Sequence, residues 1–263
     1  MAKQKRRLWV VKAGSQMVCG GGPLLIRAWM NQLADLRKNH GIDVIWVTSG
    51  AIASATERTG FKPPRGRKRT LPEKQALSAL GQPMVMETYL LALNAVGMIG
   101  AQVLLTASDI DHSGRRKNLQ NTLKTLLSWD TVPVLNENDA VATEEIQFGD
   151  NDSLSSKIAR MMNAERLVLL TDVDGLFDSD PKKNPSAQII PYRASISAKD
   201  LALAGKKAGS LRGTGGMYSK LMAAQHALKG RIVTHLVRGD WPHNLLLLAD
   251  GKSIGTQIGG RMK

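Results

Sequence analysis

Two lysines stand beside glycines at points where the chain is expected to pass between a strand and a helix. Lys12 follows the apolar run 8–11 and is itself followed closely by Gly14, so its ammonium group would lie at the exit of a strand. Lys220 lies one helical turn after the glycine-rich turn 213–216. Lysines and backbone amides at helix N-termini bind phosphate, although a solvated lysine or a surface loop can have the same sequence. Both segments are therefore candidate phosphate sites.

A third turn, 48–51, joins the apolar run 44–47 to a predicted helix. Its Ser49–Gly50 pair could present a hydroxyl group and backbone amides to an anion. Thr48 or Ser49 could equally serve as an ordinary helix N-cap. The sequence leaves both interpretations open.

Ten of the 22 acidic residues are gathered in two segments that contain no lysine or arginine. The longer segment, 136–152, follows the apolar run 132–135 directly, and the shorter one covers 171–180. Bases predominate elsewhere, and the whole chain has a formal net charge of +14. Segment 136–152 is expected to lie outside the core because it is so polar. It is either a solvated loop or a site whose carboxylates hold an amino group or fix phosphate-binding lysines, and its position after a strand favours a site.

Together these segments indicate phosphoryl transfer, which needs positioned cations and little covalent help from the protein. No Ser-His-Asp or Cys-His arrangement competes with this interpretation. The five histidines are scattered without metal-ligand spacing, and we interpret them as structural or surface residues. The single cysteine, Cys19, excludes an internal disulfide and a multi-cysteine zinc site; a buried or bystander thiol is expected there.

Short apolar runs alternate with helical patterns along the whole chain. Strands are predicted at 8–11, 44–47, 103–105, 132–135 and 167–170, and helices at 23–40, from 51, from 73, and at 119–127, 154–161 and 217–228. Pro23 suits a first helical turn and Gly41 a helix end, whereas Gly81 and Pro83 are expected to bend or break their helix. This alternation predicts an α/β fold with an open, mostly parallel sheet sandwiched by helices. Ligands bind beyond the carboxyl ends of the strands in such sheets.

The length of 263 residues suits one large domain or two small lobes. Hydrophobic residues at 43% and charged residues at 22% are typical of a globular chain and exclude wholesale disorder. No apolar run approaches the roughly 18 residues that span a bilayer. The basic N-terminus is not followed by a signal-peptide pattern. We therefore expect a cytoplasmic protein without membrane association.

With these segments in order, the sequence resembles the amino acid kinase family, and within it the members that phosphorylate glutamate. Seven segments carry the resemblance over essentially the whole chain: VVKAGS (10–15), VTSGAIA (47–53), KQALSALGQ (74–82), VPVLNENDAVA (132–142), GDNDSLS (149–155), LLTDVDGL (169–176) and GTGGMYSK (213–220). The combination of NENDAVA with GDND is the segment pair specific to the glutamate-phosphorylating members.

The resemblance implies ATP-dependent phosphorylation of the γ-carboxylate of L-glutamate, the first step of proline biosynthesis. Residues with implied catalytic roles are Lys12 and Lys220, on the ATP phosphates, and Asp152, which would hold both lysines. Implied glutamate-binding residues are Ser49, Gly50, Asp139 and Asn151, with Asp139 pairing with the substrate ammonium. Implied nucleotide-binding residues are Gly14, Thr171, Asp172, Thr214, Gly215, Gly216, Met217, Tyr218, Ser219 and Lys220. Mg²⁺ would accompany ATP, with no protein side chain assigned to the metal.

The resemblance also implies one kinase domain over 1–263, with an acceptor lobe over about 1–151 and a nucleotide lobe over 152–263. The C-terminal PUA domain that many bacterial members have is not expected. A homo-oligomer (a dimer or a tetramer) and functional coupling to glutamate-5-semialdehyde dehydrogenase are expected. Gln16 and the basic run 65–69 depart from the family pattern.

Two alternatives to glutamate phosphorylation follow from the same sequence. Another member of the family would act on a different carboxylate or on a phosphate acceptor. A nucleic-acid-binding protein on a kinase-like scaffold would account for the charge of +14 and the run 65–69. Aromatic residues at 4% and the lack of a nucleic-acid motif argue against that second alternative.

Overall fold

The computed structural model describes residues 6–142, 151–204 and 216–261. Strands and helices alternate through these ranges, as the sequence predicts. The strands are β1 (Arg7–Ala13), β2 (Ile42–Val47), β3 (Ile99–Leu105), β4 (Thr131–Glu137), β5 (Arg166–Thr171), β6 (Tyr192–Arg193), β7 (Val233–Arg238) and β8 (Thr256–Ile258). The helices are α1 (Ser15–His40), α2 (Ala51–Thr59), α3 (Leu71–Asn94), α4 (Ala107–Asp111), α5 (Ser113–Ser128), α6 (Asn151–Met161), α7 (Ala198–Leu203), α8 (Met217–Leu228) and α9 (Asn244–Ala249).

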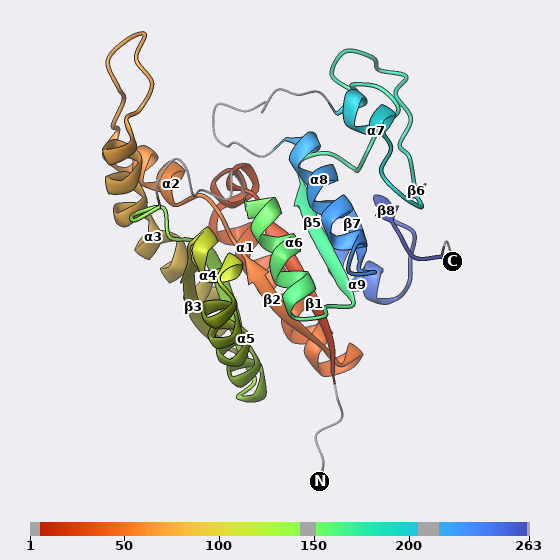
Figure 1. The fold of residues 1–263 in the computed structure, drawn as a ribbon, viewed down its shortest axis with the longest axis horizontal. Coiled ribbons are helices and arrows are strands. Elements are labelled where there is room, and N and C mark those ends of the chain that lie inside the picture. The colour runs from red at the N-terminus through yellow and green to blue at the C-terminus, as the bar shows by residue number, and fades with distance from the viewer. Residues whose placement is uncertain (1–5, 143–150, 205–215, 262–263) are drawn as a thin grey trace.

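The described strands form one sheet in the order β3-β4-β2-β1-β5-β7-β8-β6 (Figure 1). Neighbouring strands are parallel except at the β7–β8 pair, which is antiparallel. The predicted mostly parallel α/β sheet is therefore confirmed. The first four strands of the chain lie on one side of the sheet and the later four on the other, so β1 and β5 meet where the strand order reverses. Such a switch point leaves a crevice beyond the carboxyl ends of the two strands.

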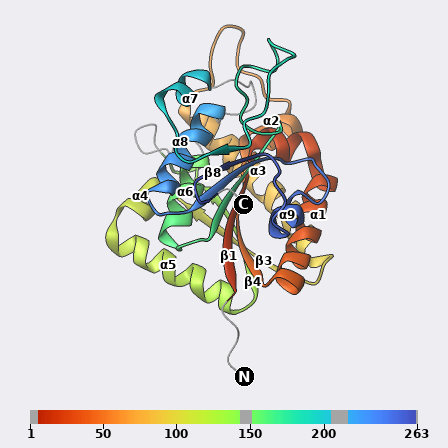
Figure 2. The ribbon, with the colours of Figure 1, turned by 90° about the vertical axis from the view of Figure 1, so that its right-hand side faces the viewer.

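Helices cover both faces of the sheet and enclose two apolar layers. One layer contains Val10, Ile45 and Leu169 from the strands, together with apolar residues of α5, α6 and α8. The other contains Trp9, Trp46 and apolar residues of α1, α3 and α9. Figure 2 shows α1 and α9 on one side of the sheet and α4, α5, α6 and α8 on the other. No helix within the described ranges is long and apolar enough to cross a membrane.

Helix α1 begins earlier than the sequence predicts. Residues 15–21 are helical, and the chain is interrupted at Gly22, whose φ of 58° lies in the left-handed region. Pro23 then opens the second helical segment, as its fixed φ favours. At the far end Gly41 adopts φ 61° and its amide donates to the Leu36 carbonyl oxygen, which confirms the predicted helix end.

Of the predicted bend or break at Gly81 and Pro83, the break does not occur, because α3 runs unbroken from Leu71 to Asn94. Its start is fixed by a capping box between Thr70 and Glu73. Pro83 is exposed, so water can satisfy the carbonyl group that loses its amide donor. Gly81 is buried against α2, and a Cβ atom there would lie 1.8 Å from the Ala51 carbonyl oxygen. This glycine permits the close approach of two helices.

Gly81→Ala should lower the free energy of unfolding by about 2–3 kcal/mol, because α2 and α3 must separate to admit the methyl group. Urea denaturation measures the change. Gly20→Ala, in the helical start of α1 where a Cβ atom meets nothing within 4 Å, is the matched control and should be neutral or slightly stabilising. Equal stability of the Gly81→Ala variant and the unmodified protein would contradict this packing role.

Candidate functional site

The sheet directs the Lys12 side chain toward α6 and α8. Side chains alternate between the two faces of a strand, so Lys12 shares a face with Val10, which packs in the α5–α6–α8 layer. In parallel register Lys12 lies opposite Val47 of β2 and Leu169 of β5. Lys12 is buried, with only 3% of its surface exposed. The sequence-predicted solvated alternative for this lysine is therefore excluded.

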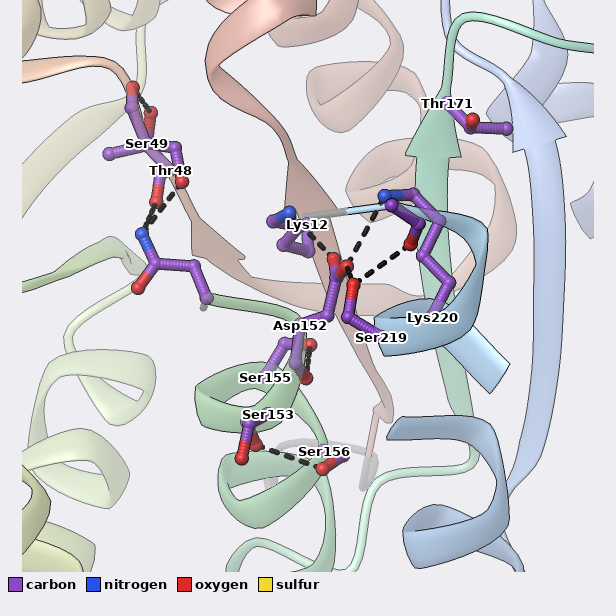
Figure 3. A network of polar contacts seen from close by, with 12 residues as sticks. Lys12, Thr48, Ser49, Asp152, Ser153, Ser155, Ser156, Thr171, Ser219 and Lys220 are labelled. Atoms are coloured by element: carbon purple, nitrogen blue, oxygen red, sulfur yellow. Dashed lines mark hydrogen bonds and ion pairs between the residues drawn. The ribbon is translucent and has the colours of Figure 1, made fainter. Parts of the chain in front are cut away.

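Asp152 lies in the first turn of α6, between two ammonium groups (Figure 3). Its Oδ1 is 2.6 Å from Lys12 Nζ, and its Oδ2 is 3.2 Å from Lys220 Nζ. Asp152 is fully buried and Lys220 is 7% exposed. The structure thus brings together the three residues that the sequence analysis expects to be catalytic.

Helix α8 supplies Lys220 and a supporting hydroxyl group. The Ser219 Oγ lies 2.8 Å from Asp152 Oδ2 and 2.8 Å from the Gly216 carbonyl oxygen. Gly216 is the N-cap residue of α8 and provides no side-chain cap. The first turn of α8 therefore adds the positive end of a helix dipole to the same region as the two lysines.

The buried charges of these three described residues do not cancel. Burial alone would raise the pKa of Asp152, but the positive charges of Lys12 and Lys220 outweigh it and hold that pKa well below its usual value. Two ammonium groups and the N-terminus of α8 gather around this one carboxylate, an arrangement that suits the binding of an anion.

A second polar cluster adjoins the first through the start of α6. The Asn151 Nδ2 lies 2.7 Å from the Thr48 carbonyl oxygen, 2.7 Å from Ser49 Oγ and 2.7 Å from Asn136 Oδ1. The N-cap of α2 is Gly50, with φ 104° and no side-chain cap. The alternative of capping by Thr48 or Ser49 is therefore wrong. Ser49 instead bonds across to Asn151, and the α2 amides carry no side-chain cap.

The acidic segment is partly core, contrary to the expectation from its polarity. Asn136 and Glu137 end β4 and are buried at 2% and 6% exposure. Asp139 follows in a turn and is half-buried; burial raises its pKa, and the nearby charge of Lys74 opposes that rise. Glu144, Glu145 and Asp150 lie outside the described residues.

Those predicted nucleotide-binding residues that the structure describes lie at the same edge of the sheet. Thr171 ends β5 and is buried, and its Oγ1 is 3.3 Å from Oδ1 of the exposed Asp172. Gly14 is the N-cap of α1, where a Cβ atom would lie 3.5 Å from Lys12 Nζ. Met217 and Tyr218 are half-buried in the first turn of α8. Thr214 and Gly215 lie outside the described residues.

Two features that the sequence left open have structural partners. In the basic run 65–69, the Arg67 guanidinium forms two hydrogen bonds with the Glu73 carboxylate and lowers the pKa of Glu73 to about 2. Cys19 Sγ lies 3.7 Å from the Gly50 carbonyl oxygen and 3.6 Å from Ser54 Oγ, so it packs behind the Ser49–Gly50 turn. Nowhere in the described residues do three or more His, Cys, Asp or Glu side chains gather to hold a metal ion.

Sequence reasoning missed two buried residues of α3, Gln82 and Tyr89, which hydrogen-bond to residues near the Ser49–Gly50 turn. Gln82 Oε1 accepts a hydrogen bond of 2.7 Å from Asn136 Nδ2, and Thr48 Oγ1 lies 3.1 Å from the buried Tyr89 hydroxyl. Burial raises the pKa of Tyr89, so its hydroxyl stays neutral. Buried polar groups require partners. A glutamine between the apolar positions of α3 was therefore the one signal in the sequence that could have pointed to Gln82.

Ligands bind at the switch point of a parallel sheet, and two buried lysines held there by one carboxylate suit phosphoryl transfer, which relies on positioned cations. Residues 7–238 match the amino acid kinase family, and the chain belongs to that family. It is 44% identical over 257 residues to a glutamate 5-kinase of Thermus thermophilus, covering 97% of this chain and 68% of that protein. It is 40% identical over 255 residues to the glutamate 5-kinase of Nitrosococcus oceani, covering 96% of this chain and 67% of that protein.

Solved structures share the fold at low sequence identity. An isopentenyl phosphate kinase superposes with a TM-score of 0.64 and 18% identity, covering 96% of this chain and all of the other. The isopentenyl phosphate kinase of T. acidophilum, in a product complex, gives a TM-score of 0.64 and 16% identity over 95% of this chain and 99% of the other. The fold class is therefore that of known kinases.

Asp152→Asn should lower the free energy of unfolding by about 3–5 kcal/mol, because two buried ammonium groups lose their counter-charge. Chemical denaturation at neutral pH measures the loss. Asp172→Asn is the matched control: Asp172 is exposed, so its neutralisation should change stability by about 0.5 kcal/mol or less. A loss no larger than that of the control would show that the lysines do not depend on Asp152.

Proposed function

We propose that the protein transfers the γ-phosphoryl group of ATP to the γ-carboxylate of L-glutamate, giving L-glutamyl 5-phosphate and ADP, the first step of proline biosynthesis. The observation that carries the proposal is the pair of buried ammonium groups of Lys12 and Lys220, both on Asp152. The identity of 40–44% to glutamate 5-kinases over nearly the whole chain supports this acceptor.

The proposed step needs charge stabilisation more than acid–base chemistry. A γ-carboxylate oxygen attacks the γ-phosphorus atom while the bond to the β–γ bridging oxygen breaks, and ADP leaves with that electron pair. The acceptor is already an anion, so no proton has to be removed. Asp152 is a poor base because its pKa is held low. The site therefore suits an anionic acceptor.

Lys12 and Lys220 are proposed to neutralise the charge that gathers where two anions meet. Each ammonium group is fixed by an oxygen of Asp152, so little reorganisation is required during transfer. Ser219 holds the second carboxylate oxygen at 2.8 Å. Asp152 acts through the lysines and is a positioning residue in this scheme.

The acceptor end of the site is proposed to lie at the Ser49–Gly50 turn, Asp139 and Asn151. The uncapped α2 N-terminus at Gly50 suits a substrate carboxylate, and the Asp139 carboxylate suits the substrate ammonium group. An ammonium partner would also stabilise the charged form of Asp139, against the effect of its burial.

The nucleotide end is proposed to lie at Gly14, at Thr171–Asp172 and in the segment 214–220. Mg²⁺ is proposed to arrive on the ATP phosphates, where it would neutralise phosphate charge. The proposal that Mg²⁺ arrives on ATP is supported by Asp152: its carboxylate oxygens already contact two lysines and a serine, so it is not assigned to the metal. The acceptor lobe would then be residues 1–151 and the nucleotide lobe residues 152–263, with β1 and β5 at their junction.

We also infer self-association and transfer of the product to a dehydrogenase. Large apolar side chains stay exposed on α3 and the edge strand β3: Leu80 at 56%, Leu91 at 64% and Ile99 at 64%. Exposed apolar groups on neighbouring elements are typical of a protein interface. The product is an acyl phosphate, which water hydrolyses, so a reductase that consumes it promptly, such as glutamate-5-semialdehyde dehydrogenase, fits the chemistry.

Purified protein with ATP, Mg²⁺ and L-glutamate should form an acyl phosphate, which hydroxylamine traps as a coloured hydroxamate. Aspartate, N-acetylglutamate and a nucleoside monophosphate, with ADP release as a second readout, form the control panel. Turnover of glutamate above every control is the expected result. Turnover of another acceptor without glutamate would reassign the substrate within the family.

A further inference from the structure

Three amide side chains, two of them buried, link helix α3 to the proposed acceptor site. Gln82 Oε1 accepts from Asn136 Nδ2 at 2.7 Å, and Asn136 Oδ1 accepts from Asn151 Nδ2 at 2.7 Å. Gln82 is 7% exposed and Asn136 is 2% exposed. We name Gln82, Asn136 and Asn151 the amide chain. It connects α3, β4 and α6, three elements that are distant in sequence.

The amide chain permits only one orientation at each member. Asn136 Oδ1 also accepts from the Glu137 backbone amide at 3.0 Å, so rotation of this side chain by 180° would set two donors against each other. Asn151 Nδ2 faces the Thr48 carbonyl oxygen as well as Asn136, so the reverse orientation would set oxygen against oxygen. Gln82 Oε1 and the Glu137 amide therefore hold Asn136 from its two ends, and Asn136 and the Thr48 carbonyl oxygen together orient Asn151.

This orientation leaves the Asn151 carbonyl oxygen for a ligand. The Asn151 Oδ1 atom is buried and has no hydrogen-bond partner in the described part of the chain. A buried acceptor without a donor is costly, so the site is complete only when a donor binds there. A substrate ammonium group has three donors and belongs to an amino acid, the substrate class of the proposed function.

We propose that Gln82 is a positioning residue for substrate selection: through Asn136 it turns Asn151 Oδ1 toward the ammonium group of the amino-acid acceptor. This inference rests on the proposed function and adds to it the residue that selects for the α-amino group. Gln82 does not contact the reacting atoms in this scheme. Its effect is therefore confined to acceptor binding.

The test compares L-glutamate with glutarate, the same dicarboxylate without the amino group. Gln82→Met keeps the side-chain length but removes the acceptor oxygen. It should raise KM for glutamate about tenfold, as expected for a weakened hydrogen bond to a charged group. The values of kcat, KM for ATP and kcat/KM for glutarate should stay within twofold of those of the unmodified protein. The preference for glutamate over glutarate should fall by the same factor of about ten.

Two further variants separate this role from a general loss of structure. Gln120→Met is the matched control, because it removes a hydrogen bond of 2.6 Å to the Met161 carbonyl oxygen on the opposite face of the sheet. It should leave the glutamate preference unchanged. Gln82→Glu keeps an oxygen acceptor in either protonation state and should retain most of the preference, even where Gln82→Met folds poorly.

Several results would overturn the inference. Equal losses with glutamate and glutarate in Gln82→Met, or a fall in kcat with an unchanged glutamate preference, would assign Gln82 a structural role only. Loss of the preference in Gln82→Glu would also contradict it. If the unmodified protein turns over glutamate and glutarate equally, the amide chain does not select for the amino group, although the proposed phosphoryl transfer stands. Unmodified protein that phosphorylates neither acid would instead overturn the proposed function, and this inference with it.

Discussion

The structure depends on one buried carboxylate that holds two ammonium groups. Asp152 has no exposed surface, and Lys12 and Lys220 come to it from a strand and from a helix at the opposite end of the chain. None of the three charges could be buried alone, because an unpaired ion in a protein interior costs several kcal/mol. Their mutual contact therefore fixes how β1, α6 and α8 pack. It also gathers two ammonium groups at the carboxyl edge of the sheet.

The sheet order explains why this contact forms where it does. Strand β1 lies between β2, from the first half of the chain, and β5, from the second. The turn after β2 and the start of α6 then meet on one side of Lys12, where Ser49 bonds to Asn151. Helix α8 approaches from the other side and brings Ser219 and Lys220. In the proposed function, a site that must join two anions would thus draw side chains from both halves of the chain.

Much of this architecture could be predicted from the sequence, for identifiable physical reasons. The strands β1, β2, β4 and β5 are continuous apolar runs because both of their faces are buried. Strand β7 was missed because Thr234 and His235 interrupt its apolar pattern, although both are buried. The unbroken α3 was missed because Gly81 looks like a helix breaker until its contact with Ala51 is known.

The candidate site, like the fold, could be predicted from the sequence only in part. Glycines and lysines at strand ends predict a phosphate site, and the family resemblance names Asp152, but no pattern within the sequence pairs Asp152 with residues 140 and 68 positions away. Gln82 lies inside a helix, in the segment 74–82, to which the family resemblance assigns no role. Its proposed role depends on the hydrogen bond from Asn136, a contact that only the tertiary structure creates.

A double-mutant cycle on kcat tests the central claim most directly. Asp152→Asn and Lys220→Ala should each lower kcat about 100-fold or more, since each removes preorganised charge stabilisation. If Asp152 acts by holding the lysines, the double variant should lose little more than the more damaged single variant. Losses that multiply in the double variant would show that Asp152 and Lys220 act independently, and would contradict the account.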